Sequence, residues 1–66
     1  MISQQLKEAT IRAWIDFGEA VKKAFGFKGF IEASPVIKIL NAEDEEKVEQ
    51  FLEYIKEQTK ALEEMD

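Results

Sequence analysis

The segment from Ser3 to Phe25 is apolar around more of its circumference than a helix on a single core requires. Wound at about 100° per residue, one stripe gathers Ile2, Leu6, Ala9, Ala13, Phe17, Ala20, Val21 and Ala24. A second set widens this stripe: Ile11, Trp14, Ile15, Gly18 and Phe25. A helix of this kind must be covered from more than one side, so one further helix cannot bury it alone.

The ends of this segment carry recognisable helix signals. Ser3 is a suitable N-cap, and Gly26 stands where a left-handed residue often ends a helix. Lys22 and Lys23 fall in the last turn, where positive charge suits the helix dipole. The sequence therefore predicts a helix from about Ser3 to Phe25.

The segment from Ala42 to about Glu64 predicts a second long helix with one apolar face. Asn41 is a suitable N-cap, and a run of acids from Glu43 to Glu46 suits the first turn. Its single apolar stripe consists of Val48, Phe51, Leu52, Ile55, Thr59 and Leu62. This helix presents one face to a core and the other to water.

The connector, residues 26–41, is apolar but irregular. Ser34 and Pro35 resemble a helix start, with Ser34 as the cap and Pro35 at the first helical position. A short helix over Pro35–Leu40 is favoured, because a strand would have no partner within one chain. A strand remains possible if a second copy pairs with it about a two-fold axis.

These elements predict one all-α domain over residues 1–66. We expect an antiparallel hairpin of the two long helices, with a short helical or strand element in the connector. Dimerisation would complete a helical bundle and bury the surplus apolar surface. The candidate self-association surface is Ile11, Trp14, Ile15, Gly18 and Phe25.

Composition argues against an enzyme. The chain of 66 residues has no cysteine and no histidine, which removes disulfides, thiolate ligands and the usual general base. Its serines and threonines therefore lack an imidazole to activate them, and no phosphate-binding glycine loop is present. We expect no catalytic residue, no metal site and no cofactor.

The stretch FGFKGF, residues 25–30, has two opposed interpretations. Gly26 to Gly29 satisfy the GxxG pattern of KH-domain loops, and residues 28–30 begin like the aromatic motif of RRM domains. The KH fold does not fit, because it needs a sheet that this chain does not predict. The RRM motif is broken at residues 31–33, where Ile, Glu and Ala replace the small residue and the aromatics that stack bases. The favoured interpretation is a helix stop followed by a turn, with Phe25, Phe27 and Phe30 as core anchors. The alternative is a nucleic-acid contact made by Lys22, Lys23, Phe27, Lys28 and Lys38.

Charge is divided unevenly along the chain, whose net charge is −5. Residues 1–40 carry six basic against four acidic side chains, whereas residues 41–66 carry three lysines against ten acids. One acidic ridge recurs every four residues: Glu45, Glu49, Glu53 and Glu57. A solvated face is the favoured interpretation, and an acidic surface that docks on a basic protein is the sharper hypothesis.

No signal peptide or membrane span is evident, so a cytoplasmic protein with no membrane association is expected. By elimination, the sequence predicts a non-catalytic interaction or regulatory module that binds itself, with another protein as a further candidate partner. The alternative function is a small nucleic-acid-associated regulator that uses the lysine and phenylalanine cluster of residues 22–38.

Overall fold

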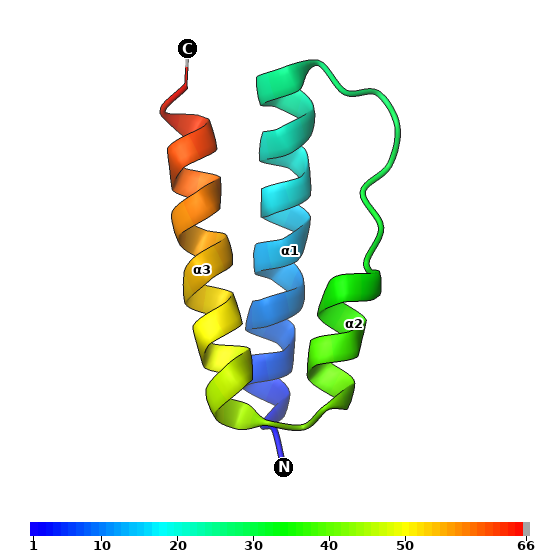
Figure 1. Cartoon of the computed structure of the whole chain (residues 1–66), viewed down its shortest axis with the longest axis vertical. Helices are drawn as coiled ribbons and strands as arrows, with labels where there is room; N and C mark the ends of the chain where they lie inside the picture. Colours follow the sequence, from blue (N-terminus) through cyan, green and yellow to red (C-terminus); the bar gives the residue numbers. More distant parts are fainter. Residues whose placement is uncertain (66) are drawn as a thin grey trace.

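The computed structural model describes residues 1–65, which form three helices and no strand (Figure 1). The first helix, α1, spans Gln4–Phe25. The Leu6 N–H donates to Ser3 Oγ at 3.1 Å, so Ser3 is the N-cap. Gly26 ends the helix in the left-handed conformation, with φ of 64°. Both predicted ends of this helix are confirmed.

The second helix, α2, spans Ser34–Asn41, so the connector contains a helix and not the alternative strand. Ser34 was expected to cap this helix, but it is the first helical residue, and Ala33 occupies the cap position without a side-chain hydrogen bond. Pro35 lies in the first turn, where its missing N–H has no helical partner to lose.

The third helix, α3, spans Glu45–Glu63 and begins later than predicted. Its N-cap is Asp44, whose Oδ1 accepts from the Lys47 N–H at 3.2 Å. Asn41 was expected to be the cap, which is wrong because α2 continues through that residue. Asn41 and Asp44 have similar capping chemistry, so the end of the preceding helix decides which one is used.

The two long helices run in the same direction, which corrects the predicted antiparallel hairpin (Figure 1). The chain leaves α1 at its far end and returns through residues 26–33 and α2, so α3 starts beside the beginning of α1. A helix of 22 residues is about 33 Å long. Eight extended residues and an eight-residue helix cover about 38 Å. The connector is therefore long enough to run back along the whole length of α1.

The core lies where the three helices meet, chiefly between α1 and α3. Its buried apolar members are Ile2, Ala13, Val36, Val48, Leu52 and Ile55. Thr10 is also fully buried, and its Oγ1 donates to the Leu6 carbonyl oxygen at 2.8 Å. That bond satisfies the hydroxyl inside an apolar core.

No described helix is both long enough and apolar enough to cross a membrane.

Candidate interaction surfaces

The connector packs back on α1 through two contacts. Trp14 Nε1 donates to the Glu32 carbonyl oxygen at 3.0 Å. Ile31 packs over Gly18 so closely that a Cβ built on the glycine would lie 3.3 Å from Ile31 Cγ1. Gly18 is consequently buried. The connector itself thus supplies part of the second cover that the wide apolar arc of α1 requires.

Trp14 belongs to an aromatic cluster between α1 and α3. Its ring lies 5.4 Å from that of Phe17 and stacks at 5.9 Å on that of Phe51, measured between centroids. All three rings are partly buried, and they pack against the core. Of the candidate self-association surface, Trp14 and Gly18 therefore lie largely within the fold of one chain.

The other three residues of that surface remain exposed. Ile11 and Ile15 are 44% and 54% exposed, and they stand one turn apart near the middle of α1. Phe25, at the end of the helix, is 65% exposed. Residues 26–33, α2 and α3 together leave this part of the apolar arc in water.

The three phenylalanines of FGFKGF were expected to be core anchors, and that expectation is wrong. Phe27 and Phe30 are also exposed, by 45% and 76%. The apolar side chain that packs this segment on α1 is Ile31, beside the Trp14–Glu32 hydrogen bond. The Phe27 ring instead packs locally over Gly29, where an added Cβ would come within 2.5 Å of its Cζ.

The structure does not gather all the candidate nucleic-acid contacts. Lys22 and Lys23 occupy the last turn of α1, and Lys28 follows on the exposed connector. Lys38 lies on α2, which runs beside the first half of α1, at the other end of the molecule (Figure 1). The first three lysines and Phe27 therefore lie around the end of α1, whereas Lys38 stands apart on α2.

The acidic ridge follows α3. Glu45, Glu49, Glu53 and Glu57 are all exposed, as a solvated face requires. Across residues 1–65, no three acidic side chains are gathered closely enough to form a metal site. The ridge is available to water or to a basic partner.

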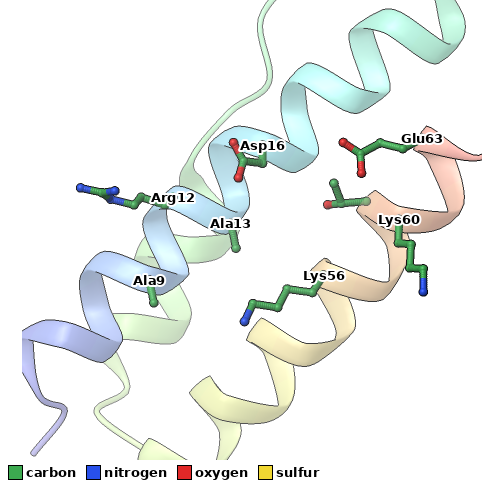
Figure 2. Close-up of a pocket in the computed structure, with 8 residues that line it drawn as sticks. Ala9, Arg12, Ala13, Asp16, Lys56, Lys60 and Glu63 are labelled. Carbon is green, nitrogen blue, oxygen red and sulfur yellow. The ribbon is translucent and has the colours of Figure 1, made fainter.

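A groove that the sequence did not reveal runs between α1 and α3 (Figure 2). It has a volume of about 270 Å³ and continues into a hollow of about 700 Å³, with Asp16, Thr59 and Glu63 lining both. Small residues, Ala9 and Ala13, lie on its α1 side. Figure 2 shows Lys56 and Glu63 reaching toward α1. The alanine spacing on α1 is a visible signal, but locating the groove also requires the parallel direction of α3.

Comparison of the chain with protein-family models, curated proteins and solved structures finds no match, so no family is assigned.

Proposed function

We propose that the protein is a non-catalytic helical interaction module that binds a second copy of itself. The observation that carries the proposal is the exposure of Ile11 and Ile15 at the middle of the longest helix. Burying such side chains removes apolar area from water at about 25 cal/mol per Å². Two exposed isoleucines one turn apart on a helix supply apolar area that a protein-protein contact can bury.

The non-catalytic part of the proposal rests on the available chemistry. The chain offers neither an imidazole nor a thiol, so its hydroxyls lack the usual activating base. The α1–α3 groove is lined by side chains of both charge signs, Arg12, Asp16, Lys56, Lys60 and Glu63. Thr59, which also lines the groove, donates its hydroxyl to the Ile55 carbonyl oxygen, and within residues 1–65 no side-chain hydrogen bond orients the five charged groups for proton transfer. A cytoplasmic location accompanies this proposal, and a chain without cysteine is compatible with a reducing compartment.

The proposal is tested by changing one isoleucine on the exposed α1 patch. Ile15→Ser should weaken the dimer by about tenfold or more, because the apolar contact is lost on both copies. Ile37→Ser is the matched control, since Ile37 is 52% exposed but lies on α2. Sedimentation equilibrium from about 1 to 100 µM, around a typical weak-dimer range, measures both. A wild-type chain that stays monomeric throughout would overturn the proposal.

A nucleic-acid role is the second candidate, and the exposure of Phe27, Phe30 and Lys28 favours it. Exposed aromatic rings beside lysines suit stacking on single-stranded bases. The net charge of −5 opposes it. Retention on immobilised single-stranded DNA that falls with added salt would support this role, and absence of retention at low salt would end it.

The acidic ridge is a third candidate surface, which would bind a basic protein. Its four exposed glutamates stand on the side of α3 away from the buried stripe. Reversing the charge of Glu49 and Glu53 together should then abolish binding of a basic partner while leaving self-association intact.

A further inference from the structure

Resting on the proposed self-association, we infer that two copies pair through antiparallel α1 helices, with a two-fold axis at Ile15. The occupant of the exposed α1 patch is thus the same patch of a second copy. In such an isologous contact, residues equally far before and after Ile15 face each other.

The central stripe of the pairing has a spacing of seven residues. Glu8, Ile15 and Lys22 follow one another at that interval within α1, so they stand almost in line along the helix. Glu8 and Ile15 are exposed and Lys22 is partly so. About the two-fold axis, Ile15 meets Ile15 of the second copy and each Glu8 meets a Lys22.

The flank of this stripe is self-complementary in the same register. Arg12 and Glu19 are also seven residues apart, and both are exposed. Their midpoint lies within one residue of Ile15, so each Arg12 faces a Glu19 of the second copy. The antiparallel register therefore places unlike charges opposite each other at both positions.

A parallel pairing of the same faces would have the opposite electrostatics. It would set Glu8 against Glu8, Arg12 against Arg12 and Glu19 against Glu19, which repel. Exposed ion pairs contribute little affinity. We therefore assign the affinity to the apolar contact centred on Ile15, and the direction of pairing to the charges.

Single-cysteine cross-linking tests the register directly, because the natural chain has no cysteine. Ile15→Cys should oxidise readily to a disulfide-linked dimer, since the two-fold axis brings the two thiols together. Ile37→Cys, an equally exposed position on α2, is the control and should not. A 1:1 mixture of Glu8→Cys and Lys22→Cys should cross-link as a heterodimer, whereas each variant alone should stay uncrosslinked. Cross-linking of each alone would show a parallel pair and overturn the inference.

A charge exchange provides a test that does not depend on thiols. Arg12→Glu alone and Glu19→Arg alone should each raise the dimer dissociation constant by about threefold to thirtyfold. Mixing these two variants should restore the affinity, because each chain then carries the charges that complement the other. Any loss of helix stability within one chain persists in the mixture, so restoration reports the contact between copies. No restoration would contradict the Arg12–Glu19 pairing.

The two levels of the proposal fail differently. If the chain stays monomeric, both the proposed self-association and the antiparallel α1 pairing are wrong. If the chain dimerises but Ile15→Cys gives no cross-link, self-association is retained and only the α1 pairing is wrong.

Discussion

Within residues 1–65, two residues have a left-handed backbone conformation, and only one of them is a glycine. Gly26 has φ of 64° and ends α1 without a side chain to strain. Glu43 has φ of 54° in the turn between α2 and α3. For a residue with a Cβ, this conformation costs about 1–2 kcal/mol. The tight turn that starts α3 therefore contains local strain.

Replacing Glu43 with glycine should relieve that strain. Glu43→Gly is expected to raise the free energy of unfolding by about 0.5–1 kcal/mol, the steric gain less the added entropy of the unfolded chain. Glu46→Gly is the matched control: it lies in the right-handed first turn of α3 and should lower that free energy, by up to about 1 kcal/mol. Urea unfolding measures both changes. Equal destabilisation by the two variants would contradict the prediction.

Among the elements, the connector is the one most dependent on a few side chains. Its residues just before α2 are held to α1 by the Trp14 Nε1–H hydrogen bond to Glu32 and by the packing of Ile31 on Gly18. Its phenylalanines point into water. Segments with few buried contacts unfold locally at low free-energy cost, so this part of the chain should be the first to detach from α1.

Loss of the tryptophan hydrogen bond should make the connector easier to cut. Trp14→Phe keeps a ring on Phe51 but removes the donor to the Glu32 carbonyl, a bond worth about 0.5–1.5 kcal/mol. Cleavage by trypsin after Lys28 should become about two- to tenfold faster. Tyr54→Phe is the control, because it also removes one polar group but from an exposed side chain on α3, and it should leave the cleavage rate unchanged. An unchanged rate in Trp14→Phe would show that the bond does not hold the connector.

The helices were predictable where local chemistry decides them. Ser3 and Gly26 give α1 correct ends because each bonds only to its own helix. The start of α3 was not predictable, because Asn41 and Asp44 are both good caps and the choice depends on how far α2 extends. The fate of the phenylalanines was also hidden, since apolarity alone cannot tell a core residue from an exposed one.

For the molecule as a whole, the direction of α3 decides which surfaces lie together, and the sequence left it open. The connector can either turn the chain sharply or run back along α1, and only packing decides between these two paths. Because it runs back, α2 forms the third side of the core, and Ile11 and Ile15 stay uncovered. A core in 66 residues supplies only about 3–5 kcal/mol, so association with a second copy is the available source of further stability.

Thermal stability should therefore depend on protein concentration. Because only the folded chain associates, the melting temperature should rise between about 2 and 200 µM, by a few degrees for a micromolar dimer. Ile15→Ser should reduce this rise, because the weaker dimer is less populated at both concentrations, and Ile37→Ser should retain it. Circular dichroism melts at the two concentrations measure this. A wild-type melting temperature that is the same at both would contradict a folded dimer.

The parallel course of α1 and α3 also governs how the chain could be joined covalently to itself. The chain starts at one end of a molecule 39 Å long, and its last described residues lie at the other (Figure 1). A tandem gene fusion of two copies packed side by side in the same direction would need a linker spanning that length, about 12 extended residues. In the antiparallel pair, the tail of one copy reaches the end where the other begins. A single-chain dimer should then close with a much shorter linker.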